Sequence, residues 1–331
     1  MMKMANILGM GFYVPEGVLT NNDLEKIVDT SDDWIIARTG IKERRIVKQG
    51  QACSDLAYEA SVKALKEAGI DPEEITHIIV ATFTADYCTP TTACVLQDKL
   101  GAKNCQMAMD VAAGCSGFTY AIDTARGLIN IYPDAKMLVV GSEVCTSRLN
   151  FQDRSTCVLF GDGAGAVVIS AEENKKKATI VDTLLRSDGS LGYLLPVGKE
   201  GGSARPYKVG YKVSPDYFIN MNGPELFKYA VRGMADMTLK ILERNNISPE
   251  ELDLFIPHQA NLRIIDAIAK RLSFPKEKIY INVDRYGNTS AASVIIALSE
   301  AYGKGLIKPG FKVLLVAFGA GLTWGSVLIE F

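Results

Sequence analysis

The sequence is poor in histidine and has no closely paired cysteines. Its 331 residues include two histidines and seven cysteines, and no two cysteines form a CxxC pair. Zinc sites in proteins combine several closely spaced cysteines and histidines, and an odd cysteine count argues against a disulfide framework. We therefore expect no metal site, and a reducing cytoplasm is the simplest location.

Long apolar runs and a large charge of one sign are also missing. No apolar run approaches the roughly 18 residues that a membrane-spanning helix needs. Gly9 and Gly11 interrupt the apolar start of the chain, and no small-residue cleavage pattern follows, so residues 7–15 are read as a first strand and not as a signal peptide. The formal net charge of -2 argues against general nucleic-acid binding. We expect neither a membrane nor a nucleic acid as partner.

The sequence does contain enough apolar residues for a large core, in an alternating pattern. Hydrophobic residues make up 48% of the chain and charged residues 22%, which suits one large domain or two closely packed ones. Strand-like runs at 75–83, 135–143 and 164–170 alternate with stretches of helical spacing at 54–68 and 90–100. This alternation predicts an α/β fold with largely parallel sheets.

The second half of the sequence repeats the first in the same order. Residues 69–80 resemble 246–257, since both are a helix end, a Pro-Glu-Glu turn and a buried strand. Residues 110–116 match 284–290, and each is followed by a helix and an apolar strand. Chance likeness between two α/β units is the alternative, but it does not explain the common order. Two copies related by an approximate twofold axis would bring equivalent loops face to face.

Cys115 stands where a strand-like run ends and helical spacing begins. The apolar run 105–111 breaks into small residues just before Cys115. A thiol at a helix N-terminus meets unpaired N–H groups and a partial positive charge, which favour the thiolate and can hold the oxyanion of a thioester under attack. A buried structural cysteine is the ordinary alternative for any single cysteine.

Three downstream loops favour a catalytic role for Cys115 over a structural one. His258 follows a strand-like run and precedes a helix that carries Arg263, and Asn288 lies in a glycine-containing turn. Residues 318–326 end a strand in glycines, whose bare backbone can approach a ligand and donate N–H groups. Each residue alone would more often be structural, but together with Cys115 they suggest a nucleophile with polar partners.

A nicotinamide cofactor is not supported. Residues 161–166 fit a loose GxGxxA pattern, but they precede the strand-like run 166–169, whereas the dinucleotide fingerprint follows a strand and opens a helix. The pair Gly9 and Gly11 lacks the third glycine, because Val14 stands there. We expect no bound cofactor.

These motifs together resemble the β-ketoacyl-acyl carrier protein synthase III family of the thiolase superfamily. The likeness runs from end to end and is most specific in PHQANLRI (257–264) and GNTSAAS (287–293). It implies an α/β, thiolase-like fold of duplicated halves in alternating helix and sheet layers, assembled as a homodimer. The N-terminal half, 1–175, would hold the nucleophile, and the C-terminal half, 176–331, the histidine, the asparagine and the glycine loop.

The resemblance also implies the chemistry. An acyl group would move from coenzyme A to Cys115, after which malonyl-acyl carrier protein would be decarboxylated and its carbanion would attack the acyl-enzyme, initiating type II fatty acid synthesis. His258 and Asn288 would stabilise the enolate oxygen, while the N–H groups of Cys115 and Gly321 would form the oxyanion hole. A coenzyme A thioester is then a substrate, and no cofactor is implied.

Binding residues are carried over from the same family. Those for coenzyme A would be Thr30, Trp34, Arg38, Arg154, Phe227, Ala260, Asn261 and Ile264. The carrier protein would dock on Arg263, helped by Lys228, Lys270 and Arg271, unless these charges are only a solvated helix face. Thr89 would reach across the dimer to cap the partner's acyl pocket. Pro224 departs from the relatives that carry an asparagine there, so a bond to the pantetheine arm is not expected.

Several alternatives remain. Elongating synthases need a second active-site histidine, but His77 precedes a buried strand, and degradative thiolases need a cysteine in the last glycine loop, where 319–325 has none. A cysteine thioesterase or hydrolase, a related condensing enzyme of a specialised pathway, and a non-catalytic acyl-carrier-binding protein stay open. The glycine-rich, basic stretch 201–211 is expected to form a mobile loop near the entrance.

Overall fold

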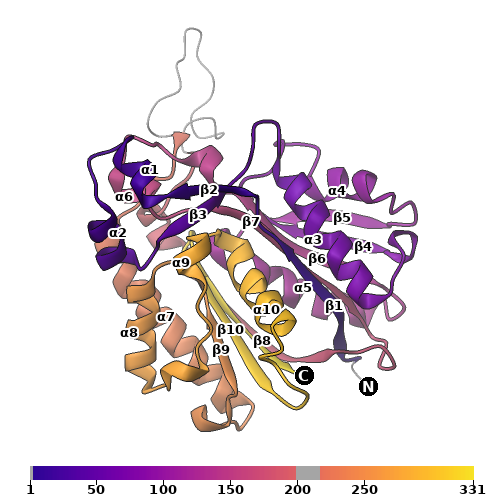
Figure 1. The fold of residues 1–331 in the computed structure, drawn as a ribbon. Helices are drawn as coiled ribbons and strands as arrows, with labels where there is room; N and C mark the ends of the chain where they lie inside the picture. The colour runs from indigo at the N-terminus through magenta and orange to yellow at the C-terminus, as the bar shows by residue number, and fades with distance from the viewer. Residues whose placement is uncertain (1–2, 199–216) are drawn as a thin grey trace.

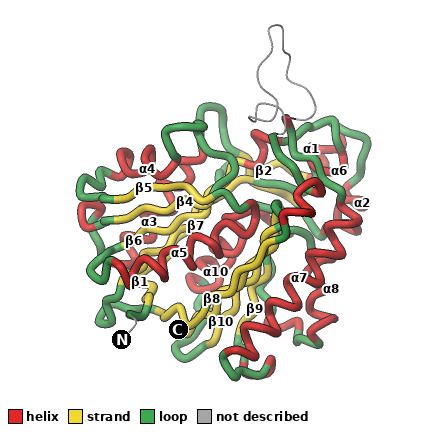
Figure 2. Tube along the Cα trace, turned by 180° about the vertical axis from the view of Figure 1, so that it is seen from behind, coloured by secondary structure: helices red, strands yellow, loops and turns green. Residues whose placement is uncertain are grey.

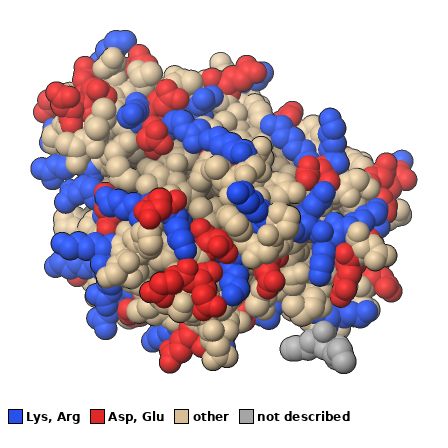
Figure 3. Space-filling view, turned by 60° about the horizontal axis from the view of Figure 1, so that its bottom comes forward, with Lys and Arg blue, Asp and Glu red and all other residues tan. Residues whose placement is uncertain are grey.

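The computed structural model of the chain describes residues 3–198 and 217–331 (Figure 1). The loop expected at 201–211 lies outside the described residues. In the described part of the chain, no helix combines the length and the apolar character needed to cross a membrane. On the face drawn in Figure 3, basic and acidic side chains are interspersed, and no single sign of charge dominates.

One sheet of nine strands runs through the molecule in the order β5-β4-β6-β7-β1-β8-β11-β10-β9 (Figure 1). A separate two-stranded sheet pairs β2 with β3. The strands are β1 (Ala5–Tyr13), β2 (Gly17–Thr20), β3 (Glu43–Ile46), β4 (His77–Ala81), β5 (Met107–Val111), β6 (Met137–Val144), β7 (Asp162–Ser170), β8 (Ala178–Ser187), β9 (Leu254–Pro257), β10 (Lys312–Gly319) and β11 (Thr323–Glu330).

The expectation of largely parallel sheets is wrong. Among the described strands, only β4 with β5, β4 with β6 and β9 with β10 pair in parallel, whereas β1, β7, β8 and β11 pair antiparallel with every neighbour. The link between β10 and β11 shows one reason, since only residues 320–322 separate them. So short a link makes a hairpin, because a parallel crossover needs a dozen or more residues.

The two ends of the large sheet follow the same order. Outward from the centre, β1, β7, β6 and β4 on one side correspond to β8, β11, β10 and β9 on the other. Beyond β4 lies the parallel β5, and beyond β9 an isolated parallel bridge joins Phe255 to Ile279. A 3₁₀ turn of sequence PEE precedes both β4 (Pro72–Glu74) and β9 (Pro249–Glu251).

At the turn that carries Cys115, the structure aligns the two sequence repeats differently from the expected match of 110–116 with 284–290. The 3₁₀ turn Gly114–Ser116 leads into one helix, and the 3₁₀ turn Ser290–Ala292 leads into its counterpart. Both turns begin at a residue with positive φ, 51° at Gly114 and 50° at Ser290. The structural equivalent of Cys115 is therefore Ala291, two residues beyond Thr289, with which the sequence match aligned it.

Helices form three layers around the two halves of the sheet. Their bounds are α1 (Asn21–Glu25), α2 (Asp32–Thr39), α3 (Cys53–Ala68), α4 (Thr92–Leu100), α5 (Gly117–Ile131), α6 (Arg154–Cys157), α7 (Gly223–Arg244), α8 (Leu262–Leu272), α9 (Val283–Tyr286) and α10 (Ser293–Gly303). Helices α3 and α4 cover one outer face and α7 and α8 the other, while α5 and α10 lie in the middle (Figures 1 and 2). The alternating helix and sheet layers expected of the fold are confirmed.

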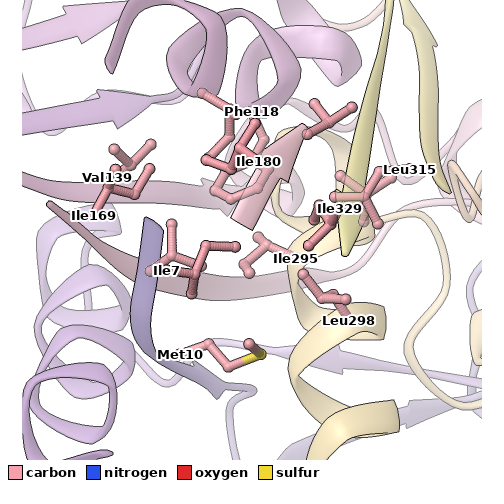
Figure 4. Close-up of a cluster of buried hydrophobic side chains, with 14 of the residues drawn as sticks. Ile7, Met10, Phe118, Val139, Ile169, Ile180, Ile295, Leu298, Leu315 and Ile329 are labelled. Carbon is pink, nitrogen blue, oxygen red and sulfur yellow. The ribbon is translucent and has the colours of Figure 1, made fainter. Parts of the chain in front are cut away.

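The middle layer is the main apolar core. Phe118 of α5 and Ile295 of α10 pack with Ile7, Ile169 and Leu315 from strands of both halves (Figure 4). Nine residues of α10 are buried, as befits a helix enclosed on all sides. A Cβ placed on Gly117 would lie 3.5 Å from the Cβ of Ala291, so the start of α5 touches the 3₁₀ turn Ser290–Ala292 that leads into α10. The turns that carry Cys115 and Asn288 consequently meet.

Candidate active site

Cys115 lies in the 3₁₀ turn that opens α5, with 7% of its surface exposed. The last glycine loop packs directly against it, because a Cβ on Gly319 would lie 3.0 Å from the Cys115 Cα and would collide with the Cys115 backbone nitrogen. Glycine at 319 therefore allows the turn that carries Cys115 to pack this closely against the last glycine loop. The strand-to-helix turn predicted for Cys115 is confirmed.

A cavity of about 290 Å³ opens beside Cys115. Its lining consists mainly of apolar side chains and of small backbone groups, namely Phe83, Ala112, Ala113, Gly114, Cys115, Phe160, Leu195, Val197, Ile219, Ser290, Ala320, Gly321 and Thr323. Cys115 and Gly321, the two residues expected to supply oxyanion-hole N–H groups, therefore share one cavity. Apolar walls of this kind suit an acyl chain.

Asn288 stands directly behind this lining. Its side-chain Oδ1 accepts the Ser290 N–H at 2.8 Å, and its backbone bridges to Phe160, which lines the cavity. The Asn288 carbonyl also accepts the Gly161 N–H at 3.0 Å. Since Oδ1 is occupied, the Nδ2 amide, a donor, is the group left to face a substrate oxygen.

His258 follows β9 and is 2% exposed. Its Nδ1 lies 2.6 Å from the Ser293 Oγ, at the start of α10. Burial lowers the pKa of His258 to about 3, so the ring is neutral. A neutral ring whose Nδ1 accepts the Ser293 hydroxyl proton carries its own proton on Nε2, where it can donate a hydrogen bond.

The thiol of Cys115 does not rest as a thiolate. Burial raises its pKa to about 12, the hydrogen bond with Ser290 acts in the opposite direction, and the charge of Glu143 raises the pKa further. Loss of hydration thus acts on this thiol in the direction opposite to the helix N-terminus, which was expected to favour the thiolate. The thiol must lose its proton during the reaction.

Three expected coenzyme A residues form one cluster. The guanidinium carbons of Arg154 and Arg38 lie 4.8 and 5.7 Å from the ring centroid of Trp34. Near them, the Thr30 hydroxyl is buried and has no hydrogen-bond partner among the described residues. An aromatic ring with guanidinium groups and a free hydroxyl suits a purine and its phosphates.

Three further residues expected to bind coenzyme A, Ala260, Asn261 and Ile264, lie around the start of α8. Both polar atoms of Asn261 are already used, because Oδ1 caps α8 through the Arg263 N–H at 2.8 Å and Nδ2 donates to the Arg38 carbonyl at 3.2 Å. Asn261 therefore holds α2 against α8. Ala260 and Ile264 are half-buried beside it.

The expected carrier-protein residues fall into two places. Arg263 lies with its guanidinium carbon 5.9 Å from the ring centroid of Phe227, and the exposed Lys228 is the next residue of α7. Lys270 and Arg271 lie two turns along α8, and Arg271 pairs with Asp236 at 3.4 Å. The structure brings Arg263 and Phe227 together, and it places Lys270 and Arg271 farther along α8.

Thr89 is exposed and does not line the cavity beside Cys115 in the same chain. It lies in the loop after β4, next to Tyr87, which is 60% exposed. A contact of Thr89 with an acyl pocket would therefore require a second chain, as expected from the resemblance.

Sequence reasoning missed three polar residues of the site: Ser290, Ser293 and Glu143. Ser290 and Ser293 belong to the GNTSAAS motif, which was the signal that could have identified them. The sequence does not show that Ser290 acts on Cys115 or that Ser293 contacts His258. Glu143 ends an apolar strand, and only the fold brings it within reach of Ser290. Among the described residues, no group of three or more His, Cys, Asp or Glu side chains could hold a metal ion.

Comparison with known proteins gives a consistent result. Residues 109–189 match the family described as 3-Oxoacyl-[acyl-carrier-protein (ACP)] synthase III, and residues 242–331 match its C terminal. The β-ketoacyl-[acyl-carrier-protein] synthase III of Oleidesulfovibrio alaskensis is 51% identical over 98% of both chains. That of Aquifex aeolicus is 48% identical over 98% of this chain and 99% of its own.

Solved structures agree in fold. The crystal structure of 3-oxoacyl-[acyl-carrier-protein] synthase III from Aquifex aeolicus has a TM-score of 0.90 at 47% identity and covers 99% of this chain and 100% of its own. The enzyme from Thermus thermophilus has a TM-score of 0.90 at 42% identity and covers 98% and 99%. The chain thus belongs to the β-ketoacyl-[acyl-carrier-protein] synthase III family, and it is an acyltransferase that performs the initiating condensation of fatty acid synthesis.

Proposed function

We propose that Cys115 takes an acyl group from an acyl-CoA primer and that malonyl-acyl carrier protein is the second substrate. The observation that supports this proposal most directly is the position of the buried Cys115 thiol at the start of α5. It lies in an apolar-walled cavity that Gly321 also lines. In the first half-reaction the sulfur attacks the thioester carbonyl, coenzyme A leaves as its thiol, and the acyl group stays on Cys115. The N–H groups of Cys115 and Gly321 hold the oxyanion.

In the second half-reaction His258 and Asn288 act as hydrogen-bond donors. Loss of carbon dioxide from the malonyl group leaves an enolate, whose oxygen accepts from His258 Nε2 and Asn288 Nδ2. The carbanion carbon then attacks the acyl carbonyl and releases the Cys115 sulfur. The neutral state of His258 supports this role, because a neutral imidazole with Nδ1 engaged by Ser293 offers a donor.

Coenzyme A binds across α2, α6, α7 and α8. Its adenine end lies on Trp34 between the two guanidinium groups, and the pantetheine arm passes Phe227, Ala260, Asn261 and Ile264 toward Cys115. The carrier protein docks on Arg263 and Lys228, whose charges suit an acidic partner. Lys270 and Arg271 make a second, weaker contact, because the pairing of Arg271 with Asp236 offsets part of its charge.

The protein works as a homodimer in the cytoplasm. Strand β5 ends the large sheet at one edge and pairs only with β4 among the described strands, and its five residues are half-buried, which leaves an edge for a second chain. The exposed loop with Tyr87 and Thr89 could then enter the partner's acyl pocket. All seven cysteines are free thiols, which suits a reducing compartment.

Two halves, 1–175 and 176–331, make up each chain. The matching strand order on either side of β1 and β8 supports this division. Duplication explains why the site lies where α5 of one half meets α10 of the other.

Product analysis tests the proposed function against its alternatives. The protein is incubated with acyl-CoA and malonyl-carrier protein, and the products are separated by mass. We expect β-ketoacyl-carrier protein and carbon dioxide. Release of free acid with no condensation would instead indicate a cysteine thioesterase or hydrolase, and absence of any turnover or covalent acyl-enzyme would indicate a binding protein. A preference for unusual starter acyl groups would indicate a specialised pathway.

A further inference from the structure

The acyl transfer proposed above requires an acceptor for the Cys115 thiol proton. With a pKa of about 12, the thiol holds its proton at neutral pH. The His258 ring is not a suitable acceptor, because burial lowers its pKa to about 3 and Ser293 occupies Nδ1. Another group near the thiol must take the proton when the sulfur attacks.

Glu143 is a fully buried carboxyl group that has no role in the chemistry described so far. It lies near the end of β6, is 0% exposed, and forms no ion pair among the described residues. Its Oε2 accepts the Thr84 hydroxyl at 2.6 Å, the Thr82 hydroxyl at 3.1 Å and the Phe83 N–H at 3.2 Å. Neutral donors thus hold the carboxylate without neutralising its charge. Burial, the larger effect, raises the pKa of Glu143, whereas the hydrogen bonds from these donors lower it.

Ser290 connects this carboxyl group to the nucleophile. Its Oγ donates to the Glu143 Oε1 at 3.2 Å. Ser290 also lines the same cavity as Cys115, and its side chain acts on the thiol in the direction that lowers the pKa of Cys115. A hydroxyl can accept one proton while it donates another, so it can pass a proton between two groups.

The backbone of Ser290 also indicates that its side chain is needed. Ser290 has a φ of 50°, a conformation that glycine adopts at no cost, and the equivalent position in the other half is Gly114 with a φ of 51°. A side chain there costs on the order of 1 kcal/mol or more. The bond from the Ser290 N–H to Asn288 Oδ1 holds it in place.

We propose that Glu143 receives the proton of the Cys115 thiol through the Ser290 hydroxyl during acyl transfer. This role rests on the proposed function. As the sulfur bonds to the acyl carbon, the thiol proton moves to Ser290 Oγ and the Ser290 proton moves to Glu143. The carbon–sulfur bond to coenzyme A breaks, and the proton moves back from Glu143 to Ser290 while the Ser290 hydroxyl donates its proton to the departing coenzyme A thiolate. Glu143 acts through Ser290, so it is a positioning residue and not one that touches the substrate.

The charge balance favours this path. The pocket holds one negative charge before the transfer, on Glu143, and one after it, on sulfur, so no further buried charge is created. Burial raises the pKa of Glu143 to about 7, although the hydrogen bonds from Thr84, Phe83, Thr82 and Ser290 act to lower it. A base of this strength is suited to working near neutral pH.

The other titratable groups around Glu143 behave differently. The Cys53 and Cys145 thiols lie close enough for its charge to act on them, and burial raises the pKa of both, so they stay protonated. Two carboxyl groups lie farther away: Asp86 acts on Cys53 and Asp162 on Cys145. Asp162, whose pKa burial raises to about 6, accepts the Thr146 hydroxyl at 2.7 Å. It is the matched control, a buried carboxyl whose hydrogen bonds come from Val47 and Thr146 and not from Ser290.

The test is the pH dependence of two reactions of Cys115 in purified wild-type and Glu143→Gln proteins: acylation by acyl-CoA, and alkylation by iodoacetamide, read for Cys115 by peptide mass. For wild type we expect both rates to rise up to about pH 7 and then level off. The reactive state has Cys115 as the thiolate and Glu143 protonated. It holds the same number of protons as the resting state with the thiol and an ionised Glu143, so above the pKa of Glu143 the ratio of the two states no longer depends on pH. In Glu143→Gln the plateau should vanish, and acylation at pH 7.5 should fall by about 100-fold.

Ser290→Ala and Ser290→Gly should lose the plateau as Glu143→Gln does. The glycine variant also removes the backbone strain, so its loss cannot be attributed to misfolding of the turn. Asp162→Asn should keep the plateau. Thermal unfolding of each variant, compared with wild type, identifies any that fails to fold, and the remaining variants then decide the outcome.

Two results would overturn the proposal. One is an unchanged plateau in folded Glu143→Gln. The other is faster alkylation in that variant at neutral pH, which is expected if Glu143 only repels the thiolate. Alkylation needs no acyl-CoA, so a wild type that alkylates with the plateau but is not acylated would contradict the proposed function and leave the proton path supported.

Discussion

At the scale of single residues, each functional side chain has one neighbour that determines which of its atoms remains free. Ser290 occupies the Asn288 Oδ1, and Ser293 occupies the His258 Nδ1. Both serines belong to the motif that identified the family, yet residue type alone did not indicate their partners. The positions of Cys115, His258 and Asn288 could be predicted because motif spacing follows strand and helix ends. The state of the Cys115 thiol could not, because it depends on burial.

His258→Ala and Asn288→Ala separate the two half-reactions. The enolate forms only after decarboxylation begins, so both variants should still take up an acyl group on Cys115. Condensation should fall by about two to four orders of magnitude, because each loses a hydrogen bond to the transition state. Rapid-quench mass analysis of the acyl-enzyme and of the carrier product measures the two steps. An equal loss of both steps would mean that these residues are structural.

At the scale of elements, α10 holds the segment that leads to Asn288. Glu300 of α10 accepts two bonds from Arg285, at 2.6 and 3.0 Å, and one from Asn282 at 3.0 Å. The Tyr286 hydroxyl also donates to it at 3.1 Å. These bonds fix α9 immediately before the Asn288 turn.

Glu300→Gln should destabilise the protein by about 2 kcal/mol at neutral pH, since charged hydrogen bonds are weakened at a largely buried position. Burial opposes ionisation of Glu300, but the bonds from Arg285, Asn282 and Lys304 outweigh it and lower its pKa to about 2. The folded pKa is below the unfolded one, so the contribution is present above the unfolded pKa and is lost as pH falls toward 2.

Urea unfolding of wild type and Glu300→Gln between pH 7 and pH 3 measures this effect. The difference between the two proteins should shrink as the pH is lowered. Glu277→Gln, at an exposed position, serves as the control and should differ little from wild type at any pH. The assignment fails if the Glu300→Gln difference is the same at both ends of the range.

The ends of helices could be predicted where the sequence contains a typical capping residue. Gly40 and Gly69 end α2 and α3 in the left-handed conformation, as expected of glycine. Helix α4 begins at Thr92 and not at Pro90, because the Thr91 hydroxyl caps it through the Cys94 N–H. Strand direction could not be predicted, since a turn as short as 320–322 fixes an antiparallel pair that hydropathy does not indicate.

At the scale of the whole molecule, the candidate site lies where the turns that lead into α5 and α10 touch. The repeat in the sequence predicted that two equivalent turns would meet, and the contact of Gly117 with Ala291 agrees with this. The two-residue offset at Ser290 was not predictable, because the positive φ that aligns it with Gly114 is a backbone property. Glu143 and Ser290 are 147 residues apart, so no local pattern connects them.

We predict that Thr89 sets the length of the acyl chain that the proposed homodimer accepts. The family resemblance implies a phenylalanine at this position in some members, and threonine leaves more room, so primers longer than acetyl should be tolerated. Each buried methylene adds roughly 0.8 kcal/mol. Acylation rates with acetyl-, butyryl- and hexanoyl-CoA test this, and Thr89→Phe should shift the preference toward acetyl. Sharp discrimination by wild type against butyryl-CoA would show that other residues fill the space.

The most direct test of the central claim is the intact mass of the protein after exposure to acyl-CoA, followed by malonyl-carrier protein. Wild type should gain the mass of one acyl group and lose it again when the carrier substrate is added. Cys115→Ala should show no gain. Stoichiometric acylation of another cysteine in that variant, or loss of the acyl group from wild type to water alone, would contradict the assignment of Cys115 as the nucleophile of a condensing enzyme.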